Sequence, residues 1–185
     1  MSEGENMIDL TEKKLKSEEV YHGRIIRVER DEVELPNGKT GVREVVRHPG
    51  GVGILALDDN MCVPMVCQYR YAFERELWEI PAGKREPGEE PLETAKRELK
   101  EEIGATAERW LPMGEVIASP GCYDEVLYLF LARGLSFGDK HPDEDEFLRT
   151  ASISFTELKE MCMSGSIKDA KTIIAVLKAK SLMGI

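Results

Sequence analysis

The stretch 83–105, GKREPGEEPLETAKRELKEEIGA, restricts the fold of this chain more than any other. Apolar residues recur in its second half at three- and four-residue spacing: Leu92, Ala95, Leu99 and Ile103. This spacing places them on one face of a helix. Pro91 suits the first turn, where its missing N–H would have no partner, and Gly104 stands where a left-handed cap is expected. The stretch therefore predicts a helix with one buried side.

Acidic residues crowd this helix. Glu98 and Glu102 are four residues apart and Glu101 is next to Glu102, so their carboxylates lie close together. Like charges at this spacing repel by about 0.2–0.5 kcal/mol per pair on an isolated helix. The cluster therefore favours a bound cation, and its oxygen donors suit Mg²⁺ or Mn²⁺ better than zinc. The alternative is a solvated acidic face, balanced by nearby basic residues: Lys96, Arg97 and Lys100.

The spacing of the whole stretch resembles the signature of the Nudix hydrolases. Gly83 is followed after five residues by Glu89, and after seven more by the run RELKEEIGA that begins at Arg97. The fixed polar positions and both glycines match, whereas Ala105 stands where the family prefers a bulkier aliphatic residue. Because the match covers the entire stretch, it outweighs the interpretation as a solvated helix face.

The resemblance implies a fold, a reaction and a metal site. The fold is an α/β/α sandwich around a mixed sheet, and the reaction is metal-dependent hydrolysis of a nucleoside diphosphate linked to another group. Carried over by position, Glu98, Glu101 and Glu102 would bind Mg²⁺ or Mn²⁺, and the carbonyl of Ala82 would add an oxygen. Arg97 would orient and partly neutralise the glutamates.

Flanking residues resemble the ADP-ribose pyrophosphatase group of that family. Pro120, sixteen residues after Gly104, matches the downstream proline of the group, and segments 68–71 and 78–83 match as well. The group implies a nucleotide-sugar substrate and a homodimer, with Pro120 at the substrate site.

The same resemblance assigns substrate contacts to three further residues. Arg70 would contact the diphosphate, and Arg43 and Glu44 would recognise the adenosine end. The alternatives are an ordinary strand arginine for Arg70 and an exposed hairpin pair for Arg43 and Glu44.

The general base stays open at this point. Some members of the family use a glutamate of the signature, whereas ADP-ribose hydrolases resemble one another in using a glutamate of a late loop. Here Glu144 and Glu146 lie in such a loop, residues 138–146. Either could deprotonate the attacking water once the loop closes over substrate. A plain acidic surface loop is the alternative for each.

Composition excludes several classes of protein. A net charge of −10 over 185 residues argues against a nucleic-acid-binding surface, which needs clustered Lys and Arg. No apolar run is long enough to span a membrane. The N-terminus lacks a signal-peptide pattern and the four cysteines are dispersed, which predicts a cytoplasmic protein with reduced thiols.

Strand and turn signals divide the chain into two parts. Residues 1–18 are polar and are expected to be loosely ordered, and the turn PNGK at 36–39 predicts a hairpin. The later strands are expected at 51–57, 61–69, 77–80, 110–118, 126–132 and 151–155. We expect a β-rich segment, 1–48, for dimerisation and substrate recognition, and a Nudix domain, 49–185.

Two helices are expected near the C-terminus. Thr156 is the predicted N-cap of the first, which would run through Met163. The second would span residues 169–180, and its predicted apolar face consists of Ile173, Ile174, Val176 and Leu177.

These features together predict an enzyme that hydrolyses ADP-ribose to AMP and ribose 5-phosphate, as the resemblance implies. Another nucleoside diphosphate sugar or a dinucleotide is the nearest alternative substrate. A noncatalytic, ligand-sensing Nudix module and a structural or partner-binding module are the alternatives from other classes.

Overall fold

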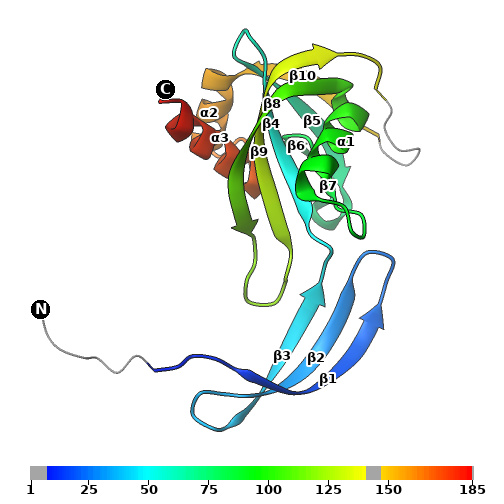
Figure 1. Ribbon diagram of the computed structural model, residues 1–185, viewed down its shortest axis with the longest axis vertical. Helices are drawn as coiled ribbons and strands as arrows, with labels where there is room; N and C mark the ends of the chain where they lie inside the picture. The colour runs from blue at the N-terminus through cyan, green and yellow to red at the C-terminus, as the bar shows by residue number, and fades with distance from the viewer. Residues whose placement is uncertain (1–7, 141–146, 185) are drawn as a thin grey trace, which may run out of the picture. The chain divides into compact units, whose positions relative to one another are not determined.

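A computed structural model describes residues 8–140 and 147–184 of the chain. Its elements are β1 (Lys13–His22), β2 (Arg27–Glu34), β3 (Thr40–Arg47), β4 (Gly51–Leu57), β5 (Cys62–Arg70), η1 (Tyr71–Phe73), β6 (Arg75–Glu79), β7 (Ala82–Lys84), α1 (Pro91–Ile103), β8 (Ala105–Ile117), β9 (Val126–Phe137), β10 (Arg149–Ser154), α2 (Phe155–Met163) and α3 (Ala170–Met183). Figure 1 shows them along the chain.

The chain forms two compact units. The first consists of Met1–His48 with Ser119–Glu125, and the second of Pro49–Ala118 with Val126–Ile185. The segment Ser119–Glu125, which sequence analysis placed in the Nudix domain, thus packs with the N-terminal part of the chain.

The first unit is a three-stranded antiparallel sheet in the order β1-β2-β3. Strand β1 begins at Lys13, so the expectation of loose order is wrong for residues 13–18. These residues are exposed and, apart from Leu15, polar, but five of the six pair with β2. Lys14 also binds the buried Asp31 at 2.9 Å. Backbone pairing and cross-strand charge order a segment that has no apolar pattern.

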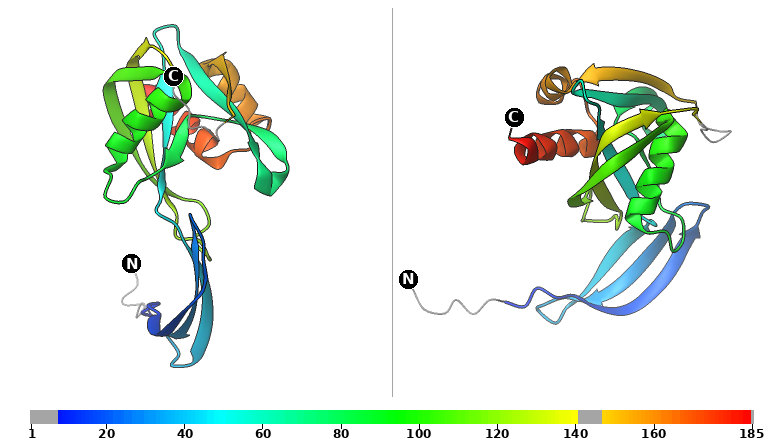
Figure 2. Two further views of the ribbon diagram at one scale, coloured as in Figure 1. Left: turned by 90° about the vertical axis from the view of Figure 1, so that its right-hand side faces the viewer. Right: turned by 45° about the horizontal axis from the view of Figure 1, so that its top comes forward.

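The second unit contains two sheets between helices. One sheet has the order β7-β4-β9-β8, with β4 and β9 parallel and the other pairs antiparallel. The other, β10-β5-β6, is antiparallel. Helix α1 lies on one side of the sheets, and α2 and α3 lie on the opposite side, as Figures 1 and 2 show. The predicted α/β/α sandwich around a mixed sheet, with a β-rich N-terminal part, is confirmed.

The helices on both sides explain the continuous apolar run of β4. Successive residues of a strand face opposite sides of its sheet. Val52, Ile54 and Ala56 pack in the core that contains α1, whereas Leu55 and Leu57 pack in the core that contains α2 and α3. All seven residues of β4 are buried. Because helices cover both of its faces, β4 is held in place, and β7 and α1 pack beside it.

Two details of the C-terminal helices differ from prediction. The N-cap of α2 is Ser154, whose hydroxyl accepts a hydrogen bond from the N–H of Glu157 at 3.2 Å. Thr156 already lies in the first turn, because β10 runs directly into the helix. On α3 the buried side consists of Lys171, Thr172, Ala175, Val176 and Ala179.

The predicted apolar face of α3 is therefore only partly correct. Val176 is buried, but Leu177 is 41% exposed, and Ile173 and Ile174 are half-buried at the edges of the contact. The small residues Ala175 and Ala179 occupy the centre, where the helix lies closest to its neighbours. No helix in the described part of the chain is long and apolar enough to cross a membrane.

Candidate active site

Helix α1 begins and ends as its sequence predicts. Pro91 occupies the first turn, and Gly104 adopts a left-handed conformation, with φ of 67°, that caps the last turn. Ala95 and Leu99 are fully buried, and Ile103 is nearly so. The helix is therefore fixed along its apolar stripe, and the acidic residues beside the stripe have fixed positions.

Two of the predicted metal ligands are buried against strand β7. Glu98 is 7% exposed and Glu102 is 2% exposed. The N–H of Ala82 donates a hydrogen bond to Oε2 of Glu102 at 2.9 Å. A Cβ atom on Gly83 would lie 1.9 Å from Cδ of Glu98. Only glycine at position 83 leaves room for this carboxylate, so β7 and α1 close around both glutamates.

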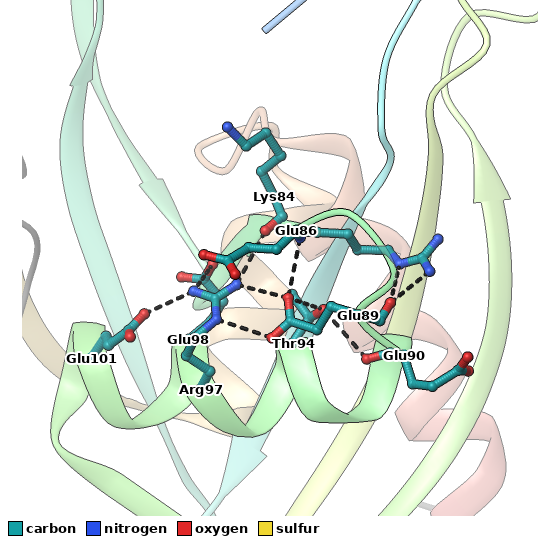
Figure 3. A network of polar contacts seen from close by, with 9 residues as sticks. Lys84, Glu86, Glu89, Glu90, Thr94, Arg97, Glu98 and Glu101 are labelled. Atoms are coloured by element: carbon teal, nitrogen blue, oxygen red, sulfur yellow. Dashed lines mark hydrogen bonds and ion pairs between the residues drawn. The ribbon is translucent and has the colours of Figure 1, made fainter.

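Arg97 contacts three carboxylates, and one of them belongs to Glu98 (Figure 3). Its Nε and Nη2 atoms donate to the two oxygens of Glu89, each at 3.1 Å. Its Nη1 atom donates to Glu98 at 2.8 Å and to Glu101 at 2.9 Å. The hydrogen bonds to Glu89, and then the charge of Glu98, raise the pKa of Arg97 against the opposing effect of burial. This guanidinium remains charged and holds the acids in fixed orientations.

Glu89 ties the loop before α1 to the helix. Besides Arg97, its Oε2 accepts hydrogen bonds from the hydroxyl of Thr94 at 2.8 Å and from the N–H of Glu86 at 3.2 Å. The hydrogen bond from Arg97, with smaller contributions from Thr94 and Glu86, lowers the pKa of Glu89 to about 2. Arg85 donates to the carbonyl oxygen of Glu89 from Nη2 at 2.6 Å. Both the side chain and the backbone of Glu89 therefore hold the loop in place.

The donor set around Gly83 fits a hard divalent cation. Carboxylate oxygens are ligands that Mg²⁺ and Mn²⁺ prefer, and Gly83 leaves room for the carboxylate of Glu98 beside β7. Within residues 8–140 and 147–184, no group of three or more His, Cys, Asp or Glu side chains is arranged so that it could hold a metal ion. Arg97 contacts Glu98 and Glu101, so an ion held with Glu102 would share these carboxylates with the guanidinium.

Arg70, predicted to contact a diphosphate, belongs to a second ionic cluster in the same unit. Its Nε and Nη2 atoms donate to the two oxygens of Glu79, each at 2.6 Å. Lys171 of α3 also binds Glu79, and it donates to Asp169 at 3.0 Å. The hydrogen bonds that Arg70 donates to Glu79, and then the charges of Glu79, Asp169 and Glu102, raise the pKa of Arg70 against the effect of burial. The charge of Glu102 therefore acts on Arg70.

Sequence analysis missed Glu79 and Lys171. Glu79 ends a strand between Trp78 and Ile80, where an acid at an apolar position signals a buried partner. The lysine had a weaker signal, because it follows Asp169 in the first turn of a helix and resembles an ordinary solvated residue. Its partner is 92 positions away, so spacing alone could not join them.

The predicted adenosine contacts lie in the first unit. Arg43 donates to Glu12 from Nε at 2.8 Å and to the carbonyl of Val42 at 2.9 Å. Glu44 is exposed on the same strand, opposite Arg30. The structure thus keeps Arg43 and Glu44 on β3 and gives Arg43 a carboxylate partner from the segment before β1.

Pro120 lies in the segment Ser119–Glu125, which is attached to the end of β3. The N–H of Val46 donates to the carbonyl of Cys122 at 2.7 Å, and that of Asp124 donates to the carbonyl of Val46 at 3.1 Å. Arg47 binds Asp124 at 3.2 Å. The structure therefore places Pro120 in one unit with Arg43 and Glu44. Glu144 and Glu146, the predicted bases, lie outside the described residues.

Two family models match the chain in adjoining segments. The family model of the NUDIX domain matches residues 47–174, and that of the nucleoside diphosphate sugar hydrolase N-terminal domain matches residues 12–46. The chain belongs to the Nudix family. The two matches adjoin between residues 46 and 47, two residues before the boundary between His48 and Pro49 in the structure.

Two curated relatives cover nearly the whole chain. An ADP-ribose pyrophosphatase of Bacillus subtilis (strain 168) is 42% identical over 92% of this chain and 93% of its own length. A methanol dehydrogenase activator of Bacillus methanolicus is 42% identical over 89% of this chain and 90% of its own. A solved structure, described as that of an ADP compounds hydrolase, superposes with a TM-score of 0.82 at 22% identity and covers 94% of each chain. That structure supports the fold.

Proposed function

We propose that this protein is a divalent-metal-dependent hydrolase that cleaves ADP-ribose to AMP and ribose 5-phosphate. The observation that carries the proposal is the pair of buried carboxylates, Glu98 and Glu102, enclosed by the backbone of Ala82 and Gly83. Carboxylate oxygens are the ligands that Mg²⁺ and Mn²⁺ prefer. The choice of ADP-ribose is supported by the Bacillus subtilis relative.

The residues of α1 would act by holding charge in place. Glu98 and Glu102, with Glu101 and the carbonyl of Ala82, would hold Mg²⁺ or Mn²⁺. A bound ion of this kind polarises a phosphoryl oxygen and neutralises the charge that develops on the leaving phosphate. Arg97 keeps the carboxylates oriented through its bonds to Glu98 and Glu101.

Hydrolysis adds one water across the diphosphate. The water oxygen forms a bond to one phosphorus, and the bridging P–O bond breaks, which gives AMP and ribose 5-phosphate. A carboxylate must accept the proton of the water. We propose Glu144 or Glu146 for this step, and substitution of each by Gln, singly and together, tests the assignment. The pair is excluded as the base if the double variant keeps the wild-type kcat.

One assay tests the reaction and its substrate. The purified protein is incubated with Mg²⁺, or with Mn²⁺ in a parallel series, and with ADP-ribose, other nucleoside diphosphate sugars and dinucleotides. Released AMP and ribose 5-phosphate are measured by chromatography. We expect the highest kcat/KM with ADP-ribose. Preference for another substrate would contradict the substrate assignment, and absence of metal-dependent turnover with every compound would contradict the enzyme class.

A second candidate function is the activation of an alcohol dehydrogenase. The methanol dehydrogenase activator is as similar to this chain as the pyrophosphatase is. Addition of the protein to a purified methanol dehydrogenase, with the Glu98→Gln variant as control, tests this function. Activation by wild type would support it, and equal dehydrogenase rates with and without the protein would contradict it.

We also propose a homodimer in which the first unit recognises the adenosine end of the substrate through Arg43, Glu44 and Pro120. The first unit supports this by exposing apolar residues on its strands, among them Leu15, Val20 and Val42. Light scattering of the full chain measures the mass. A monomeric mass at assay concentrations would contradict the dimer. A cytoplasmic location stays a prediction that cell fractionation tests.

A further inference from the structure

Glu79 is a buried carboxylate with two cationic partners of different kinds. Its side chain is 2% exposed at the end of β6. Arg70 binds both of its oxygens, and Lys171 binds one of them. Burial acts to raise the pKa of Glu79, but Arg70 and Lys171 outweigh burial and hold this pKa below its usual value. The carboxyl group of Glu79 is therefore ionised because two cations contact it.

Lys171 is built into the interior. Its side chain is 10% exposed, and Asp169 also binds its ammonium group. Asp169 in turn caps α3 by accepting hydrogen bonds from the N–H and the hydroxyl of Thr172, at 3.0 and 2.5 Å. That hydroxyl accepts the N–H of Ile80 at 2.9 Å. These contacts link the first turn of α3 to the strand end that carries Glu79.

Arg70 is the partner nearer to solvent. It is the last residue of β5, and its side chain is 39% exposed. Its bidentate geometry with a carboxylate is also the geometry with which guanidinium groups bind phosphate. An incoming diphosphate could therefore compete with Glu79 for the same donors.

Such an exchange costs free energy if it leaves the buried charge of Glu79 without a partner. Removal of one partner from a buried ion pair destabilises a protein strongly, because the other charge is left uncompensated. Arg70 and Lys171 together balance the charges of Glu79 and Asp169. If Arg70 turns to an anion, Lys171 remains in contact with both carboxylates.

We propose that Lys171 is the resident counter-ion of Glu79, and that its presence allows Arg70 to exchange Glu79 for the diphosphate of the substrate. Lys171 is in this view a positioning residue, which acts on substrate through Glu79 and Arg70. The inference rests on the proposed function in one respect, namely that Arg70 contacts the diphosphate.

The substitution Lys171→Met removes the charge and keeps much of the side-chain volume. Without Lys171, Glu79 should hold Arg70 more tightly. We expect KM for ADP-ribose to rise about tenfold, with kcat changed less than about threefold. The double variant Glu79→Gln/Lys171→Met removes the charges of both Glu79 and Lys171, so Arg70 is released and KM should return to within about threefold of wild type.

Rescue by the double variant separates exchange from a merely structural effect. If Lys171 only stabilises the fold, the second substitution removes another buried contact and KM does not recover; that result would overturn the proposal. The matched control is Lys178→Met on the same helix, whose ammonium donates to the carbonyl of Met113 and which should leave KM unchanged. Thermal unfolding of every variant measures the loss of stability separately.

A binding measurement keeps the test independent of the reaction. The dissociation constant of ADP, at a fixed Mg²⁺ concentration, is measured by calorimetry on the same proteins. Weaker binding by Lys171→Met and recovery by the double variant support the exchange even if wild type cleaves no ADP-ribose, which would contradict only the proposed function. Equal ADP binding by wild type and Lys171→Met overturns the exchange.

Should Lys171→Met fail to fold, the wild-type protein still decides. The ¹⁵Nε–H signal of Arg70, assigned with Arg70→Lys, is followed by NMR during titration with ADP and Mg²⁺. A shift of this signal with retained protection of the Lys171 ammonium supports the exchange. An unchanged Arg70 signal at saturating ADP contradicts it.

Discussion

The two ionic clusters of the second unit differ in their charge balance. Around Arg97 one guanidinium contacts three carboxylates, Glu89, Glu98 and Glu101. Around Glu79 two cations, Arg70 and Lys171, balance two carboxylates, Glu79 and Asp169. The first cluster has too little positive charge and can accept a metal ion. The second has a cation nearer to solvent than its partner carboxylate and can accept an anion.

This difference suits a substrate that consists of a metal ion and a diphosphate, because the first cluster can bind the cation and the second can bind the anion. Metal-assisted phosphoryl chemistry needs carboxylates for the ion and a guanidinium for the phosphate oxygens. The charge of Glu102 contributes to the raised pKa of Arg70, so the clusters act on each other electrostatically. We therefore expect substitutions in the cluster around Arg97 and substitutions in the cluster around Glu79 to change different measured quantities.

The largest effect is expected from Glu102→Gln. The amide keeps the shape but loses the charge of a buried carboxylate that we propose as a metal ligand, so kcat for ADP-ribose should fall on the order of 10²–10³-fold. Hydrolysis rates and circular dichroism measure activity and fold. The matched control is Glu115→Gln at an exposed position of β8, which should be neutral. Near-normal turnover by Glu102→Gln would remove the carboxylate-rich cluster from the mechanism.

The next largest effect is expected from Gly83→Ala. The new Cβ would overlap the carboxylate of Glu98, so we expect the free energy of unfolding to fall by about 1–3 kcal/mol and Mg²⁺ affinity to weaken. Denaturant unfolding and metal titration measure these quantities. Gly138→Ala serves as control, because its nearest neighbour in space lies at an ordinary 3.9 Å. Unchanged metal affinity in Gly83→Ala would show that metal binding does not need the close approach of Gly83 to Glu98.

Arg97→Gln should change the pH dependence of stability. The pKa of Glu89 is lowered from 4.5 to about 2, mainly by Arg97. A carboxyl group whose pKa is lowered in the folded state contributes stability above its unfolded pKa and loses it as pH falls through the folded value. Wild type should thus lose stability as pH falls from about 4.5 to about 2.

In Arg97→Gln this loss should be smaller, because Glu89 titrates closer to its ordinary pKa in the folded state. Unfolding free energies measured across the acid range test the prediction. Parallel curves for wild type and variant would mean that Arg97 does not set the ionisation of Glu89.

The smallest effect is expected from Lys96→Ala on the outer face of α1. Lys96 and Glu93 form an exposed pair at 2.8 Å, and pairs of this kind contribute about 0.2–1 kcal/mol. Denaturant unfolding should show a change within that range, with kcat for ADP-ribose unaltered. A large loss of activity would place the outer face of α1 in the site and would contradict the division of its charges.

Local patterns were sufficient for α1. Its apolar stripe, Pro91 and Gly104 all lie within a few turns of one helix, where side-chain geometry follows directly from sequence spacing. Glu98 and Glu102 flank the stripe, so their burial could be expected. The same reasoning was less successful on α3, where the buried side depends on how closely the helix approaches the sheet.

Long-range pairing had no local signal. Strand β1 lacks an apolar pattern, and it forms because β2 supplies its hydrogen bonds. Ser119–Glu125 joins the first unit through bonds to Val46, although its neighbours in sequence belong to the second. Residues that meet across a sheet or between a strand and a helix can be recognised only when the topology is known.

By itself the sequence determined the Nudix helix, its glycine turn and the acids that would hold a metal ion, because these are contacts over short stretches of chain. The tertiary structure decided which charges compensate one another. It brought Lys171 to Glu79 across 92 positions. Lys171 and Thr172 of α3 contact Glu79 and Ile80, and the burial of Glu79 makes its second cation necessary.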